Sequence, residues 1–347
     1  MHVPDGFIDA PTSAVTAVVA AGALAVSLRG ARRELDERTA PLAGLVAAFI
    51  FAVQMLNFPV AGGTSGHLLG GALAAILVGP YTAVLCVSVV LLMQGVLFAD
   101  GGLTALGVNI TDMAIVTTVV SYAVFRGLLA VLPRKRRSVT VASFVAALVS
   151  VPAAAVAFTL IYAVGGTTDV SLAKVATAMI GVHVLIGIGE AVITALTVGA
   201  VIAVRPDLVH GARGLRQRLR LRVDGVLVDA PAPAAPVAAR TSRRTLWVTG
   251  LVTSLVLAGF VSFYASASPD GLEKVAHDKG IDRKARKHPA SGSPLAGYGV
   301  RDVNDSRLSG GLAGVIGVGV TIVTGSTVFW AVRRRRSDDV SPANTVV

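Results

Sequence analysis

Residues 175–204 read VATAMIGVHVLIGIGEAVITALTVGAVIAV, an almost uncharged run that is long enough to cross a bilayer as one helix. Comparable apolar runs cover residues 13–28, 41–60, 139–163, 245–267 and 310–332. Across the chain, 54% of residues are hydrophobic and 15% are charged, whereas a soluble domain usually carries about 25% charged residues. The sequence therefore predicts an all-α fold, a polytopic helical membrane protein.

Arginine-rich clusters lie between the apolar runs and predict the topology, because basic loops stay on the cytoplasmic side of a membrane. The expected cytoplasmic clusters are Arg29–Arg38, Arg134–Arg137, Arg205–Arg244 and Arg333–Arg336. An even number of spans must connect the first two, and the helices expected to supply them lie near 41–60, 66–79, 81–98 and 108–131. The prediction is a seven-helix core followed by a two-helix module, with an external amino terminus and a cytoplasmic carboxyl terminus.

Composition also divides the chain and excludes several classes of protein. The expected regions are a membrane core at 1–204, a basic and then Pro/Ala-rich cytoplasmic linker at 205–244, a two-helix module at 245–336 with an external loop at 268–309, and a cytoplasmic tail at 337–347. The net charge of +11 follows from the topological clusters and does not indicate nucleic-acid binding. Cys86 is the only cysteine, which excludes a disulfide framework or a thiolate metal site.

The amino terminus, MHVPDGF, contains the groups of a metal chelator. A free terminal amine, the amide nitrogen of residue 2 and the imidazole of His2 close adjacent five- and six-membered chelate rings. A fourth nitrogen would complete a square, a geometry that suits Ni(II), Cu(II) or low-spin Co(II). Because a bulky second residue blocks removal of the initiator methionine, we expect Met1 to be retained as a ligand. Pro4-Asp5-Gly6 predicts a turn that folds the terminus back into the protein.

A second histidine follows a glycine-rich stretch, AGGTSGHLLGG at 61–71. The predicted topology places His67 at the external end of a helix, on the same side as Met1. Glycines recur at every fourth position, 62, 66 and 70, a pattern that allows close packing of another segment. His67 is therefore the candidate fourth ligand.

Several polar residues fall at membrane depth, where ionisable groups are costly and usually functional. They include Gln54, Asn57, Asn109, Asp112, His183 and Glu190. One interpretation is hydrogen bonding between helices. The other is that some of them orient the ligating imidazoles, and the candidates for that role are Ser65, Asn57, Asn109, His183 and Glu190.

The chain resembles a known family at these residues. MHVPDGF, GGTSGHLLGG and GVHVLIGIGEAVIT at 181–194 are similar to the CbiM/NikM substrate-capture (S) component of energy-coupling factor transporters for cobalt and nickel. The resemblance implies that Met1, His2 and His67 bind Co(II) or Ni(II) as the transported substrate, without an organic cofactor. It also implies a transmembrane coupling (T) subunit and two cytoplasmic ATPase subunits as partners, in the cell membrane of a prokaryote.

The second module carries Pro269-Asp270-Gly271-Leu272-Glu273, which looks like the PDGLE signature of the small CbiN/NikN subunit. The resemblance implies that two normally separate subunits are fused in one chain. The predicted topology places residues 268–309 on the same side as Met1. We therefore expect Asp270 and Glu273 to act on metal loading at the external mouth of the core.

Other functions remain as alternatives to uptake. The chain lacks HExxH, a phosphate-binding GxxxxGK[ST] loop and a nucleophile–base set, so it is not expected to be an enzyme or to hydrolyse ATP. A membrane metal-binding sensor or accessory protein without transport is the alternative function. The short tail at 337–347 counts against a sensor, because an output domain is absent from it. The ligand types do not distinguish cobalt from nickel.

Overall fold

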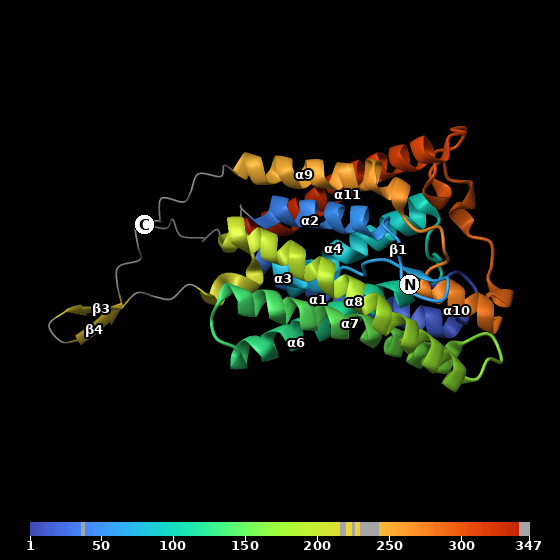
Figure 1. Ribbon diagram of the computed structural model, residues 1–347, viewed down its shortest axis with the longest axis horizontal. Coiled ribbons are helices and arrows are strands. Elements are labelled where there is room, and N and C mark those ends of the chain that lie inside the picture. The colour runs from blue at the N-terminus through green and yellow to red at the C-terminus, as the bar shows by residue number, and fades with distance from the viewer. Residues whose placement is uncertain (36–38, 216–219, 224–225, 230–242, 340–347) are drawn as a thin grey trace, which may run out of the picture.

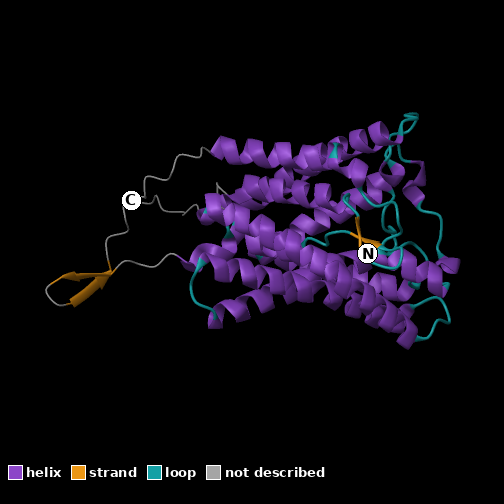
Figure 2. Cartoon of the chain, viewed as in Figure 1, coloured by secondary structure: helices purple, strands orange, loops and turns teal. Residues whose placement is uncertain are grey.

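The computed structural model describes residues 1–35, 39–215, 220–223, 226–229 and 243–339. In this part of the chain, long helices run side by side along one axis, and strands form only two short pairs (Figures 1 and 2). The strand pairs are β1 (Phe58–Pro59) with β2 (Ser65–Gly66), and β3 (Arg220–Val223) with β4 (Val226–Asp229). The predicted all-α class is confirmed.

The core consists of helices that pass back and forth between two ends of the bundle. In chain order they are α1 (Ala10–Glu34), α2 (Thr39–Gln54), α3 (Gly71–Val78), α4 (Pro80–Met93) with its π-helical continuation η1 (Gln94–Phe98), α5 (Leu106–Asn109) followed by the π-helix η2 (Ile110–Val116), α6 (Thr117–Val131), α7 (Arg136–Gly165) and α8 (Leu172–Val204). Met1 lies at one end, here called the amino-terminal end (Figure 1).

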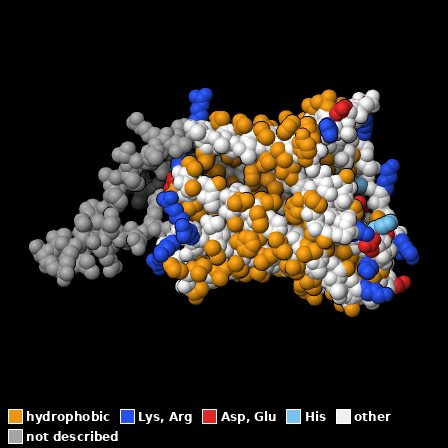
Figure 3. Space-filling view, in the orientation of Figure 1, with side chains coloured by type: hydrophobic (Ala, Val, Ile, Leu, Met, Phe, Trp, Pro, Cys, Tyr) orange, Lys and Arg blue, Asp and Glu red, His pale blue; other side chains and the backbone are white. Residues whose placement is uncertain are grey.

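On the face shown in Figure 3, apolar side chains cover the middle of the described part of the bundle, and charged side chains gather at both ends. Seven helices within the described residues are long and apolar enough to cross a membrane. Valines and leucines on their outer faces are exposed, for example Val18 at 72% and Leu160 at 63%. This distribution is that of a protein whose solvent is lipid across the middle and water at the ends.

The predicted helix at 66–79 is wrong in its first part. Helix α3 begins only at Gly71, and the chain from Ser65 to Gly70 is not helical. The segment still passes from one end of the bundle to the other. His67 contacts the amine of Met1 at the amino-terminal end, whereas Gly79 packs on the carboxylate of Glu34 at the opposite end.

Long-range side chains explain why this segment is not helical. An extended chain inside an apolar bundle needs partners for its main-chain polar groups. The carboxylate of Glu190 accepts hydrogen bonds from Leu69 N at 2.7 Å and Gly70 N at 3.1 Å, and Gln54 Nε2 donates to Leu69 O at 3.0 Å. Gly70 has φ +91°, which only glycine adopts easily. Gly66 and Gly70 do allow close packing, since a Cβ would lie 2.6 Å from Ile186 and 2.7 Å from Ile50, but Gly62 has no such neighbour and the segment that they shape is extended.

The carboxyl-terminal module has two long helices, α9 (Arg243–Gly259) and α11 (Ser306–Asp339), which pack against α2 and each other. Their connection contains a helix that the sequence analysis missed, α10 (Gly271–Lys279), at the amino-terminal end of the bundle (Figure 1). The start of the predicted linker, from Pro206 to Leu215, forms short 3-10 helices, and Val209 and Ala212 within it are buried. The Pro/Ala-rich linker and most of the predicted tail lie outside the described residues.

Candidate metal centre

The amino-terminal segment lies against the first part of the continuous helix that α5, η2 and α6 form. Asn109 at the end of α5 accepts a hydrogen bond from Val3 N at 2.7 Å and donates to Val3 O at 3.2 Å. The carboxylate of Asp5 accepts from Thr104 N at 2.8 Å and from its hydroxyl at 2.5 Å. These contacts fix residues 3 and 5, so the position of Met1 and His2 is determined by the fold.

The predicted turn at Pro4-Asp5-Gly6 is present and is covered by the second module. Gly6 has φ +91°, and a Cβ there would overlap the carbonyl oxygen of Lys284. Arg286 N donates to Asp5 O at 2.8 Å. The connection between α9 and α11 therefore lies directly on the amino-terminal turn, and glycine at position 6 permits that approach.

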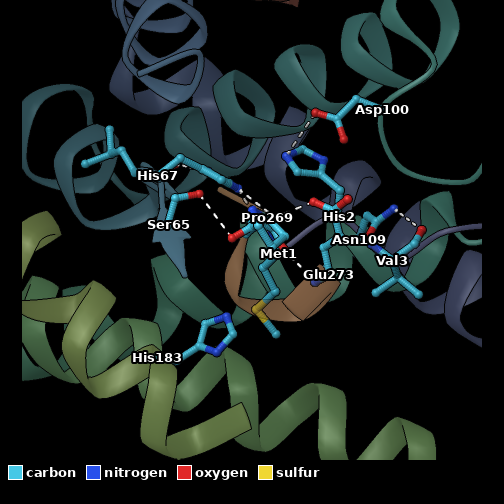
Figure 4. Close-up of polar contacts among 12 residues, drawn as sticks. Met1, His2, Val3, Ser65, His67, Asp100, Asn109, His183, Pro269 and Glu273 are labelled. Carbon is cyan, nitrogen blue, oxygen red and sulfur yellow. Dashed lines mark hydrogen bonds and ion pairs between the residues drawn. The ribbon is translucent and has the colours of Figure 1, made fainter. Parts of the chain in front are cut away.

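Two of the predicted ligand atoms face each other. The amine nitrogen of Met1 is 2.8 Å from Nε2 of His67 (Figure 4). With metal–nitrogen bonds of about 2.0 Å, two neighbouring ligands at a right angle are separated by about 2.8 Å. His67 Nδ1 lies 3.0 Å from Leu68 O. A hydrogen bond from Nδ1–H to this carbonyl leaves the lone pair on Nε2, the atom that faces Met1.

His2, whose main-chain and ring nitrogens are the other two predicted ligand atoms, lies beside this pair (Figure 4). Its ring centroid is 5.2 Å from that of His67. Its Nδ1 is buried and has no hydrogen-bond partner within the described residues, and its main-chain N–H makes no described hydrogen bond either. Burial lowers the pKa of His2 to about 4, against the opposing effect of Asp100, whose Oδ2 is 3.7 Å from Nε2. His2 is therefore neutral near pH 7, the form that binds metals.

Asp270 of the second module completes the surroundings of the amine. Its Oδ2 lies 2.8 Å from Met1 N and 3.7 Å from His67 Nε2. Burial would raise the pKa of Asp270, but the terminal ammonium and His67 outweigh this effect and hold it well below its usual value. Its other oxygen accepts from Glu273 N at 2.8 Å, and the Glu273 carboxylate accepts from Asp270 N. These two hydrogen bonds form a capping box at the start of α10.

Each part of Pro269–Glu273 has a structural role. Pro269 O accepts a hydrogen bond from Ser65 N at 2.9 Å, next to the His67 segment. Gly271 lies on α8, where a Cβ would be 2.8 Å from Cδ1 of Ile186. The buried side chain of Leu272 adds to the core. The motif thus attaches α10 to the core and directs the Asp270 carboxylate at Met1.

The remaining predicted residues have different positions. His183 lies beyond the side chain of Met1 (Figure 4), with Nδ1 2.7 Å from Met179 O and no described partner for Nε2. The Glu190 carboxyl group accepts hydrogen bonds from the main-chain N–H groups of residues 69 and 70. The main-chain carbonyl of Asn57 accepts a hydrogen bond from Ser266 N at 2.7 Å. The nitrogen site opens into a cavity of about 500 Å³ between core and module, which His2, His67, Asn57, Asp100, Asp270, Glu273 and Tyr298 line among others.

Asp100 and Tyr298 were missed by sequence reasoning. The Tyr298 hydroxyl donates to Asp100 Oδ2 at 2.6 Å, which joins the loop of the module to the core beside His2. No sequence signal distinguishes Asp100 from other loop acids. Two of the four candidate ligand atoms are the terminal amine and a main-chain nitrogen, not side-chain atoms. Among the described residues, no group of three or more His, Cys, Asp or Glu side chains could hold a metal ion.

Comparisons with known proteins identify the family. Residues 2–208 match the family model CbiM, described as "Cobalt uptake substrate-specific transmembrane region". The chain belongs to the CbiM family. Residues 244–334 match the PDGLE domain, so a CbiM region and a PDGLE domain occur in one chain. It is a membrane protein of a transition-metal transport family.

Relatives combine or separate these two regions. The putative fused nickel transport protein NikMN of Archaeoglobus fulgidus is 39% identical over 60% of this chain and 68% of its own. The cobalt transport protein CbiM of Sorangium cellulosum is 32% identical over 62% of this chain and 97% of its own. A crystal structure of a transition metal transporter is similar to 59% of this chain and 93% of its own, with a TM-score of 0.52 and 31% identity.

Proposed function

We propose that this protein is the metal-capture subunit of an energy-coupling factor importer and binds Co(II) or Ni(II) at its amino terminus. The ligands are Met1 N, His2 N, His2 Nδ1 and His67 Nε2. The observation that carries the proposal is the 2.8 Å separation of Met1 N and His67 Nε2, which suits adjacent ligands of one ion. Four nitrogens in a plane favour Ni(II) or low-spin Co(II) over Zn(II) or Ca(II).

The proposal includes an orientation and partners. The amino-terminal end is external, and the opposite end, with Arg134, Arg136 and Arg137, is cytoplasmic. A transmembrane coupling subunit and two ATPase subunits supply the energy, so ATP hydrolysis takes place outside this chain, and the protein lies in the cell membrane of a prokaryote. The names of the relatives include both nickel and cobalt, and the nitrogen ligands suit either ion.

The second module acts on loading in this proposal. We assign residues 1–204 to the metal-capture domain and 245–336 to the loading module, joined by the linker at 205–244. Asp270 contacts the amine ligand, and Glu273 fixes Asp270 through the capping box and lines the cavity. A carboxylate at this position attracts a hydrated dication and is close enough to pass it to the amine.

Calorimetry on the purified full chain tests the ligand set. His67→Ala should abolish tight binding of Ni(II) and Co(II), as should insertion of one glycine between Met1 and His2, because insertion enlarges the chelate. His277→Ala is the matched control, since that ring is 79% exposed on α10 and remote from the amine. Wild-type affinity in the insertion variant would refute the amino-terminal site. Uptake of radioactive nickel by cells that also carry the coupling and ATPase subunits tests the transport role.

A further inference from the structure

The loop that follows η1, residues 99–102 and here called the His2 loop, forms one wall of the position that His2 occupies. A Cβ added at Gly101 would lie 3.3 Å from both Cβ and Nδ1 of His2, so the main chain of the loop lies against this side chain. Asp100 directs its Oδ2 at Nε2 of His2, at a distance of 3.7 Å (Figure 4). The loop therefore contacts the imidazole on both of its nitrogen sides.

The second module holds the same loop from outside. Three of its side chains bond there: Ser293 Oγ donates to Leu97 O at 2.6 Å, His288 Nε2 lies 3.1 Å from Gly101 O, and the Tyr298 hydroxyl donates to Asp100 Oδ2 at 2.6 Å. The ring of Tyr298 also stacks on Phe98, with centroids 4.9 Å apart. None of these residues belongs to Pro269–Glu273, so the module reaches the candidate centre by a second route.

The contact between Asp100 and Tyr298 has unusual backbone on both sides. Ala99 has φ +55° and Tyr298 has φ +58°, and residues other than glycine rarely adopt such values. These conformations persist only where the surroundings fix them, and they are frequent at ligand-binding sites. Simple packing of one loop on another does not require them, so the position of Asp100 is a feature to explain.

The chemistry of the His2 ring gives Asp100 a role. In the proposed site Nδ1 is the ligand atom, so the one hydrogen of the neutral ring is on Nε2, the atom that faces Asp100. A carboxylate behind a metal-binding imidazole fixes the ring and makes it a stronger donor. The separation of 3.7 Å is longer than a hydrogen bond, but the carboxylate still acts on the positive charge that the ring gains when it binds a dication. His67 differs, because its second nitrogen faces the carbonyl of its own neighbour, Leu68.

We propose that Asp100 is a positioning residue for the His2 ligand and that Tyr298 of the second module holds Asp100 in place. This inference rests on the proposed function and deepens it. The module then acts on the two parts of the chelate separately. Asp270 contacts the amine of Met1 directly, whereas Tyr298 acts on the His2 ring through Asp100.

The test uses Asp100→Asn, Tyr298→Phe and their combination in the purified full chain. Asp100→Asn removes the charge but keeps an acceptor for Tyr298. Its Ni(II) affinity in calorimetry should fall by about tenfold, the lower end of the range for such partners, because Asp100 is 30% exposed. Tyr298→Phe keeps the ring on Phe98 and should lower affinity by about threefold to tenfold. Because Tyr298 acts through Asp100, the double variant should bind no more weakly than Asp100→Asn.

The visible absorption band of bound Ni(II) separates positioning from general attraction of cations. In Asp100→Asn and Tyr298→Phe saturated with Ni(II), the band should move to longer wavelength, because a less basic His2 is a weaker ligand. Asp169→Asn is the matched control for charge, since Asp169 is an exposed acid between α7 and α8 at the same end of the core. Tyr264→Phe is the control for the hydroxyl, since Tyr264 is 73% exposed in the second module. Both controls should keep wild-type affinity and the wild-type band.

Wild-type affinity or an unchanged band in Asp100→Asn overturns the inference. A double variant that is weaker than Asp100→Asn by the full factor of Tyr298→Phe overturns the role of Tyr298. If Asp100→Asn does not fold, Tyr298→Phe decides, and an unchanged band in that variant overturns the inference. If His67→Ala still abolishes binding, only the role of Asp100 fails; if His67→Ala binds normally, the proposed function itself fails.

Discussion

Gly271 determines how closely the PDGLE domain approaches the candidate metal centre, and Gly271→Ala tests that contact. A Cβ at this position would lie 2.8 Å from Cδ1 of Ile186, 3.2 Å from Cγ1 of Val182 and 3.3 Å from Cε1 of His183. Alanine must therefore displace these side chains or lift α10 from α8. Overpacking of this kind typically costs about 1–3 kcal/mol. Because Asp270 immediately precedes Gly271, lifting α10 separates the carboxylate from the amine of Met1.

The accessibility of that amine provides the assay. Met1 is buried and ion-paired in the intact protein, so it reacts with an acylating reagent only when α10 opens. A cost of about 1–3 kcal/mol raises the open population, and hence the acylation rate of Met1, by about 5- to 150-fold. Mass spectrometry of the amino-terminal peptide measures the rate. Gly292→Ala is the matched control. Gly292 also lies between α9 and α11, and a Cβ added there would have no atom within 4 Å. Equal rates in both variants would refute the packing argument.

Three further predictions concern the support of the site. His2 should titrate near pH 4 in histidine-selective NMR, because burial lowers its pKa from the usual value of 6.5. Docking of the terminus is therefore strongest above pH 6.5 and weakens as pH falls toward 4; a midpoint near 6.5 would contradict its burial. Glu190→Gln should lower the free energy of unfolding by about 1–3 kcal/mol in denaturation experiments, since it replaces one of the two oxygens that accept from Leu69 N and Gly70 N by an NH2 group that cannot accept, whereas Thr177→Val on the exposed face of α8 should change it little. Asn109→Leu should weaken Ni(II) binding by about tenfold or more in calorimetry, because loss of the bonds to Val3, each about 1 kcal/mol, frees the chelating segment; unchanged affinity would show that the chelate orders itself.

Local sequence was sufficient for most of the fold. The run at 175–204 is apolar on all sides, so it is stable in lipid and not in water, and it predicts a membrane span. Helix α8 covers that run. The segment at 66–70 could not be predicted in the same way. Its Gly-His-Leu-Leu-Gly composition is compatible with a helix end, and its extended form depends on Gln54 and Glu190, which are distant in sequence. Long-range satisfaction of main-chain groups overrides local preference here.

Part of the candidate metal centre could also be predicted from local sequence, and part of it could not. The chelating capacity of Met1 and His2 is a property of adjacent atoms, so sequence reasoning reaches it directly. The approach of His67 required only that two segments share one end of the bundle. The contact of Asp100 with His2 depends on a loop conformation after η1, in which Ala99 adopts φ +55°. Asp100-Gly101-Gly102 marks a turn but does not indicate where the Asp100 carboxylate points, and α10 was missed because it is short and polar.

The packing of the two module helices holds their connecting loop close to the candidate centre. Helices α9 and α11 both pack against α2, so the connection between them is held near the candidate centre whether or not its own contacts are formed. A tethered contact acts at an effective concentration in the millimolar range. The polar contacts of Asp270, Arg286 and Tyr298 can therefore be weak and still be formed most of the time. Weak contacts open readily, while the packed helices keep the module from leaving. Replacing residues 268–300 by a neutral linker should accordingly leave the helices packed but reduce nickel uptake in cells, and full uptake would show that the helices alone suffice.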